Sequence, residues 1–167
     1  MSLVGISIFV TLAQTSAPRI VSLKEFSEAY GKNDIQTVSD YFDDDAVWDG
    51  PLVDELKGKE AILENYKKFQ KNTISMEVIP ESHLVDGKKE ISVWLIKLRH
   101  KKISDGDPVE VRGMSEIWRS EKTGRVIRHR NYFDSGPLLY QSIPVVGWLI
   151  RFFIKQQPHD SVPPLLK

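Results

Sequence analysis

The pattern of hydrophobic and polar positions divides the chain into a helical first part and an extended second part. Up to residue 72, apolar residues recur every three or four positions in three segments, which is the spacing of one helix face. The first of these segments opens with Ser22-Leu-Lys-Glu25, the form of a helix capping box. The pattern predicts helices over residues 22–31, 33–42 and 59–72, with a short strand at 46–48.

From residue 74 onward the apolar positions belong to extended segments separated by turn residues, which predicts β-strands. The turns are expected at Asp86-Gly87, at 104–108 and at Lys122-Thr123-Gly124. Because the helices come first and the strands follow, the fold class is expected to be α+β, with helices filling one face of a curved antiparallel sheet. The predicted strands span residues 74–86, 91–98, 109–118 and 126–133.

Composition narrows the possible partners. The 167 residues suffice for one domain, and 23 basic residues balance 23 acidic ones. This balance argues against a nucleic-acid partner, which would need a basic excess. The chain has no cysteine and no phosphate-cradling glycine-rich loop, so we expect no thiolate chemistry and no cofactor.

Three segments are expected along the chain: an arm over 1–20, the domain over 21–136 and an apolar tail over 137–167. The tail is too short and too polar to span a bilayer, which leaves three interpretations: a lid, a dimer contact or a membrane-surface contact. An apolar run near the N-terminus lacks the preceding basic residues of a signal peptide. We therefore expect a cytoplasmic protein, with secretion as the alternative.

Two stretches resemble a known superfamily. Tyr41-Phe-Asp-Asp-Asp-Ala-Val-Trp48 with Gly58-Lys-Glu-Ala-Ile62, and His129-Arg-Asn-Tyr-Phe-Asp134, are similar to SnoaL-like members of the nuclear-transport-factor-two-like superfamily. Relatives in that superfamily include ketosteroid isomerases and limonene epoxide hydrolases. The resemblance implies a cone-shaped, strongly curved sheet wrapped around three helices, with a ligand pocket between them.

The chain departs from the catalytic patterns of those relatives. The resemblance places Gly50 where ketosteroid isomerases carry their aspartate base, Phe26 at their tyrosine, and Ser115 near their buried acid. At the catalytic positions of the epoxide hydrolases the chain has Leu95, Lys97 and Asn131. Since an amide cannot take a proton as a carboxylate does, neither reaction is expected in its usual form.

Seven residues are the candidates for a site. We expect Asp49 and His129 to be the catalytic pair, because the histidine titrates near neutral pH and the aspartate ends the short strand near the pocket. The competing interpretations are a buried structural histidine and a turn aspartate before Gly50. Residues 43–45 are interpreted as a turn rather than a metal site, so no metal is expected. The candidate ligand-binding residues are Asn131, Trp48, Tyr41, Lys97 and Ser115.

Two hypotheses for function follow. The first is a protein that binds a small apolar molecule, with the option of cofactor-independent isomerase, cyclase or hydrolase chemistry by acid and base groups. The alternative is a non-catalytic dimerisation or ligand-sensing module. A homodimer is expected through the outer face of the sheet, because Trp94, Ile96 and Leu98 form one apolar face of a strand. Catalysis predicts that Asp49 and His129 converge in a pocket.

Overall fold

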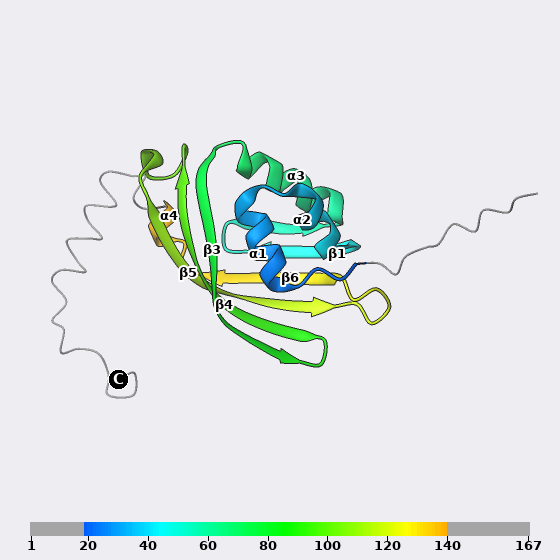
Figure 1. Ribbon diagram of the computed structural model, residues 1–167. Coiled ribbons are helices and arrows are strands. Elements are labelled where there is room, and N and C mark those ends of the chain that lie inside the picture. Colours follow the sequence, from blue (N-terminus) through cyan, green and yellow to red (C-terminus); the bar gives the residue numbers. More distant parts are fainter. Residues whose placement is uncertain (1–18, 140–167) are drawn as a thin grey trace, which may run out of the picture.

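Helix α1 (Leu23–Lys32) begins at the capping box that the sequence predicts. Glu25 N donates to Ser22 Oγ at 3.2 Å, and Ser22 N donates to Glu25 Oε2 at 2.9 Å. The structure is a computed structural model, and it describes residues 19–139 (Figure 1). The predicted arm up to residue 18 and the predicted tail from residue 140 lie outside the described residues.

The junction between the first two helices differs from the prediction. Asn33 ends α1 in a left-handed conformation (φ 60°), and Asp34 caps α2 (Ile35–Tyr41) by accepting from Thr37 N at 3.2 Å. The sequence places this second start at Asn33. A short polar side chain tolerates the left-handed region, so Asn33 closes one helix and leaves capping of the next to its neighbour.

Four strands after residue 72 confirm the extended second part of the chain, and two more strands lie before it. The sheet order is β2-β1-β6-β5-β4-β3. Its strands and the third helix are β1 (Phe42–Gly50), β2 (Val53–Lys57), α3 (Lys59–Gln70), β3 (Thr73–Asp86), β4 (Lys89–His100), β5 (Val109–Arg119) and β6 (Val126–Phe133); a 3₁₀ turn η1 (Ser104–Gly106) follows β4, and α4 (Gly136–Leu139) follows β6.

The sheet is mixed rather than wholly antiparallel, which corrects the prediction. Strand β1 runs parallel to β6, with Trp48 opposite His129, whereas every other neighbouring pair is antiparallel. The acidic run 43–45, predicted as a turn, lies inside β1, and β2 was not predicted at all. The α+β class is confirmed, but the structure does not show the sheet strongly curled.

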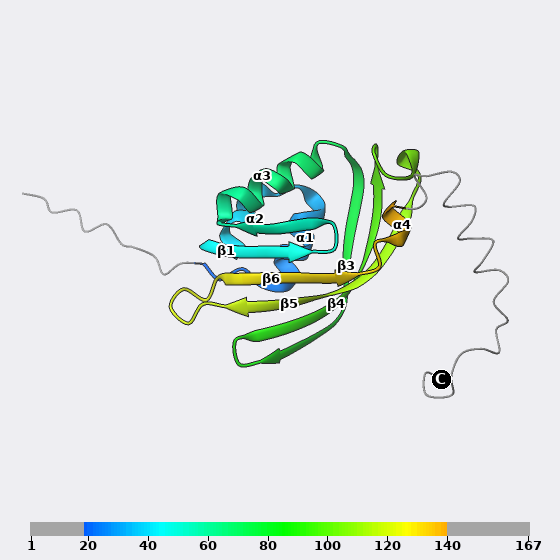
Figure 2. The same cartoon turned by 180° about the vertical axis from the view of Figure 1, so that it is seen from behind.

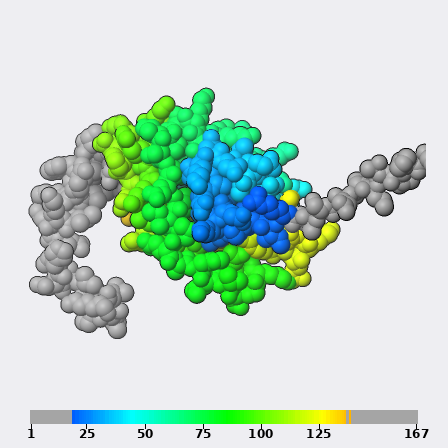
Figure 3. All heavy atoms as spheres, in the orientation of Figure 1, coloured from blue at the N-terminus to red at the C-terminus, as the bar shows by residue number. Residues whose placement is uncertain are grey.

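Helices α1, α2 and α3 lie together on one face of the sheet, as the two opposite views show (Figures 1 and 2). In the space-filling view α1 and α2 (blue) lie directly against green strands (Figure 3). The core between the layers is fully buried at Val38 and Tyr41 of α2 and at Phe42, Ile117 and Val126 of the sheet. Among the described residues, no helix is long and apolar enough to cross a membrane.

A bulge interrupts the alternation of faces along β6. Trp118 pairs with Arg128 while Arg119 pairs with Val126, so Ile127 is an extra residue between two register points. As a result Val126 is buried and Ile127 is 38% exposed. Strict alternation back from His129 would place Ile127 on the inner face, but the bulge shifts the alternation by one residue and turns Ile127 outward.

Candidate functional site

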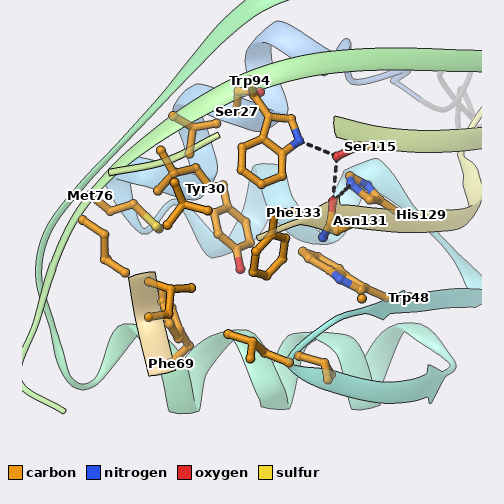
Figure 4. Close-up of a pocket in the computed structure, with 18 of the residues that line it drawn as sticks. Ser27, Tyr30, Trp48, Phe69, Met76, Trp94, Ser115, His129, Asn131 and Phe133 are labelled. Carbon is orange, nitrogen blue, oxygen red and sulfur yellow. Dashed lines mark hydrogen bonds between the residues drawn. The ribbon is translucent and has the colours of Figure 1, made fainter. Parts of the chain in front are cut away.

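A cavity of about 440 Å³ lies between the helices and the inner face of the sheet. Its walls are mainly apolar and aromatic. They come from α1, α3, α4 and all six strands, with β2 contributing only its first residue, Val53. Figure 4 shows side chains from helix and sheet turned into this space. The aromatic part of the wall consists of Phe26, Tyr30, Trp48, Phe69, Trp94 and Phe133.

The apolar face of β4 lines this cavity. Trp94, Ile96 and Leu98 all point inward, and Trp94 is only 7% exposed. The sequence assigns these three residues to an outer dimerisation face, and that assignment is wrong. Strand periodicity separates two faces but does not say which of them the helices cover.

Trp94 can lie flat against β5 because its partner residue there is Gly113. A Cβ at position 113 would be 2.5 Å from Trp94 Cη2 and 2.7 Å from the backbone oxygen of Tyr132. Any side chain at Gly113 would therefore force the indole out of its place. The glycine fixes the position of the Trp94 ring, and with it the direction of the indole N–H.

Four residues form a buried polar chain at one end of the cavity, here called the amide network. Trp94 Nε1 donates to Ser115 Oγ at 2.8 Å, and Ser115 Oγ donates to Asn131 Oδ1 at 2.7 Å. His129 Nε2 lies 3.1 Å from the same Asn131 oxygen. Figure 4 shows the Asn131 side-chain nitrogen on the cavity side of this network, and no described residue accepts a hydrogen bond from it.

His129 is held in a neutral form. Burial lowers the pKa of His129 to about 4, against the opposing effect of its hydrogen bond to Asn131. The ring is 3% exposed and stacks on Trp48 with centroids 5.0 Å apart. Since the Asn131 oxygen can only accept, the proton of the neutral ring sits on Nε2, and Nδ1 has no partner among the described residues.

Asp49 does not meet His129. It follows Trp48 in β1 and therefore points to the opposite face of the sheet. There Arg130 donates to its two oxygens at 2.6 and 3.1 Å, and Arg128 donates at 2.9 Å. Burial raises the pKa of Asp49, but the hydrogen bonds from Arg130 and Arg128 outweigh it and hold the carboxyl pKa below its usual range. The convergence that catalysis by this pair predicts is not formed.

The other candidate residues divide into those on the cavity wall and those away from it. Trp48, Ser115 and Asn131 line the cavity with His129, and their binding roles stay predictions. Tyr41 is fully buried and stacks on Phe26 with centroids 4.0 Å apart, so it belongs to the core. Lys97 lies on the opposite face of β4 from Trp94 and is exposed. The structure therefore brings four of the seven together.

The wall of the cavity carries no carboxylate among the described residues. Gly50, at the position that the resemblance assigns to a catalytic base, does line it, and a Cβ there would lie 3.2 Å from Asn131 Cβ. His129 and His100 are the described wall residues with a titratable group near neutral pH, and burial lowers the pKa of both. What the site offers at its polar end is an amide N–H₂ group.

Sequence reasoning missed Trp94 and Gly113 as site residues. One signal was present: Ser92 and Ser115 interrupt otherwise apolar inward positions and prove to be opposite each other on β4 and β5. A small hydroxyl residue on a buried strand face indicates a buried hydrogen bond, for which a nearby indole is a suitable donor.

Three helices packed on a six-stranded mixed sheet in this order form the nuclear-transport-factor-two-like fold. The profile of the SnoaL-like domain matches residues 23–129, more than half of the chain. The chain belongs to the SnoaL-like domain family. No significant match was found among curated proteins.

Solved structures support the fold. An LEH-like epoxide hydrolase from M. tuberculosis is 18% identical with a TM-score of 0.60, over 77% of this chain and 92% of that one. A hypothetical protein with a ketosteroid isomerase-like fold from Catenulispora acidiphila, in complex with trimethylamine, is 12% identical with a TM-score of 0.63, over 72% and 90%. A candidate SnoaL-like polyketide cyclase from Shewanella denitrificans is 16% identical with a TM-score of 0.58, over 74% and 92%. At these identities the likeness shows the fold alone.

Proposed function

We propose that this protein binds a small, largely apolar molecule in the cavity and holds it by an acceptor oxygen hydrogen-bonded to the Asn131 amide. The observation that carries the proposal is an amide N–H₂ group that faces an apolar cavity and has no acceptor within residues 19–139. A volume of about 440 Å³ is in the range of small-molecule sites, which combine apolar walls with a few polar groups. The aromatic wall favours a ligand with a flat ring system.

Binding is favoured over proton-transfer catalysis. An acid–base mechanism needs a group that exchanges a proton with the ligand at working pH. The described part of the wall holds no carboxylate, and the Nε2 proton of His129 is directed to Asn131. His129 therefore acts as a positioning residue for the amide. A non-catalytic ligand carrier or sensor in a family that includes cyclases and hydrolases fits this arrangement best.

Blocking the cavity tests the proposal. Ile96→Trp fills the space from β4, and we expect it to weaken binding of 2-acetylnaphthalene, an apolar ketone probe, by at least about tenfold in titration calorimetry. Native mass spectrometry of protein purified from its own host should show a small molecule that this variant lacks. The added ring costs about 1 to 3 kcal/mol of stability, so folding is checked by circular dichroism.

Leu95→Trp is the matched control, because Leu95 is the next residue on the same strand and points to the other face. It should bind the probe like the wild type. Equal binding by wild type and Ile96→Trp, or no binding of the probe and no co-purified molecule, would contradict the proposal.

Asp49→Asn separates the two candidate residues of the sequence. We expect unchanged probe affinity, because the carboxylate faces Arg128 and Arg130 rather than the cavity. Stability should fall by about 1 kcal/mol as this partly exposed ion cluster loses its charge. Urea unfolding and titration calorimetry measure the two quantities. A large loss of probe affinity with normal stability would return Asp49 to the site.

A homodimer remains a proposal, although the β4 face of Trp94, Ile96 and Leu98 that first motivated it lines the cavity instead. Analytical sedimentation at micromolar protein tests this proposal, and a monomer under those conditions would contradict it.

A further inference from the structure

We infer that Trp94, acting through Ser115, fixes the orientation of the Asn131 amide, so that the cavity selects a ligand with a hydrogen-bond acceptor, such as a ketone, over the matching alcohol. The inference rests on the proposed binding function, because it specifies what the Asn131 amide recognises. It assigns Trp94 and Ser115 as positioning residues that set specificity.

The direction of the network is set at Trp94. An indole N–H can only donate, so Ser115 Oγ, 2.8 Å away, must accept from it. The single hydroxyl proton of Ser115 is then free for an acceptor, and Asn131 Oδ1 lies 2.7 Å away. Trp94 is 7% exposed and Ser115 3%, so water does not compete for these groups.

The opposite amide orientation would leave two buried donors without acceptors. Turning the amide would place its nitrogen against both Ser115 Oγ and His129 Nε2, which would then have to accept. The Ser115 proton would lose its acceptor, and the His129 proton would move to Nδ1, which has no partner among the described residues. Buried donors without partners are rare and costly, whereas an unused lone pair costs less. The amide oxygen therefore faces the network and the nitrogen faces the cavity.

A ligand at this end of the cavity consequently meets N–H donors and no acceptor from Asn131. A carbonyl oxygen accepts from the amide and brings no proton of its own. An alcohol oxygen also accepts, but its proton then faces the aromatic rings of Trp48 and Phe133 that flank the amide (Figure 4). An unsatisfied hydroxyl proton in such surroundings should weaken binding by about tenfold relative to the ketone.

The test compares the affinities of 2-acetylnaphthalene and 1-(2-naphthyl)ethanol by titration calorimetry. Wild type should prefer the ketone by about tenfold. In Trp94→Phe the donor that directs Ser115 is lost, so the Ser115 proton is no longer tied to Asn131 Oδ1 and only His129 still holds the amide oxygen. The ratio of the two affinities should then fall measurably below its wild-type value.

A control variant keeps the network intact. Tyr30→Phe removes a hydroxyl group that Figure 4 shows turned into the cavity and that lies outside the amide network. It should keep the ketone preference. An equal affinity of wild type for the two probes, a ratio unchanged in Trp94→Phe, or a ratio lost in Tyr30→Phe would overturn the inference while leaving the binding function standing. Absence of binding by either probe would overturn both.

Discussion

Glu90→Gln is expected to lower the free energy of unfolding by about 3 to 5 kcal/mol, because it leaves a buried guanidinium without its counter-ion. The Glu90 carboxylate is 8% exposed; it contacts Arg119 Nε through one oxygen and His83 Nε2 at 2.8 Å through the other. The Arg119 side chain is 14% exposed, lies 5.4 Å above the Tyr41 ring, and donates to the Gly124 backbone oxygen at 3.0 Å. The cluster thus joins the β3–β4 hairpin to the β5–β6 turn and the core.

Urea unfolding followed by tryptophan fluorescence measures the loss, and the melting temperature should drop by roughly 10 °C. Glu64→Gln is the matched control, since Glu64 pairs with Lys68 on the surface of α3, where both side chains are more than two-thirds exposed. That exposed pair should contribute little that can be measured. If Glu90→Gln costs no more than Glu64→Gln, water reaches the cluster and the premise of burial fails.

The second large effect is a loss of stability on mild acidification, caused by His129. An unfolded histidine titrates near 6.5, whereas burial lowers the pKa of His129 in the folded protein to about 4. Between these values the unfolded chain binds more protons than the folded one, so stability falls as the pH falls. Above about pH 6.5 the stability contribution is fully present. It is lost progressively as the pH falls, and by about pH 4 the loss of stability amounts to about 3 kcal/mol.

The measurement is a series of urea titrations from pH 7.5 to pH 4 on wild type and on His129→Gln, which keeps an amide donor for Asn131. Burial also lowers the pKa of His100, so the comparison between the two proteins isolates His129. The variant should lose about 3 kcal/mol less over this range. Parallel pH profiles for the two proteins would show that His129 takes up protons in the folded state as readily as in the unfolded one.

Local chemistry was enough to predict much of the fold. The capping box at Ser22 and Glu25, the amphipathic helices and the bounds of β6 involve residues within a few positions of one another. The resemblance to the SnoaL-like family supplied the overall architecture, and the domain match over residues 23–129 shows that family. The parallel pairing of β1 with β6 escaped prediction because it joins segments about 80 residues apart, and no turn between them specifies it.

The candidate site was predictable only in part. His129 and Asn131 were both candidates from the sequence, and both line the cavity. The apolar face of β4 with Trp94 was expected outside and Asp49 inside, and both placements were reversed. Trp94 was misplaced because alternation separates the two faces of a strand but the choice between them depends on where the helices pack; Asp49 was misplaced because its position at the end of a short strand does not say to which face its side chain points.

The sequence by itself determined the helices, most of the strands and the α+β class. Only the tertiary structure decided that Asp49 pairs with two arginines on the outer face and that Trp94, Ser115, Asn131 and His129 form one hydrogen-bonded network. The physical reason is that these contacts join neighbouring strands whose register and inward face are set by the packing of the whole domain. The alternation of side chains along a strand shows only that the strand has two faces, not which of them is buried.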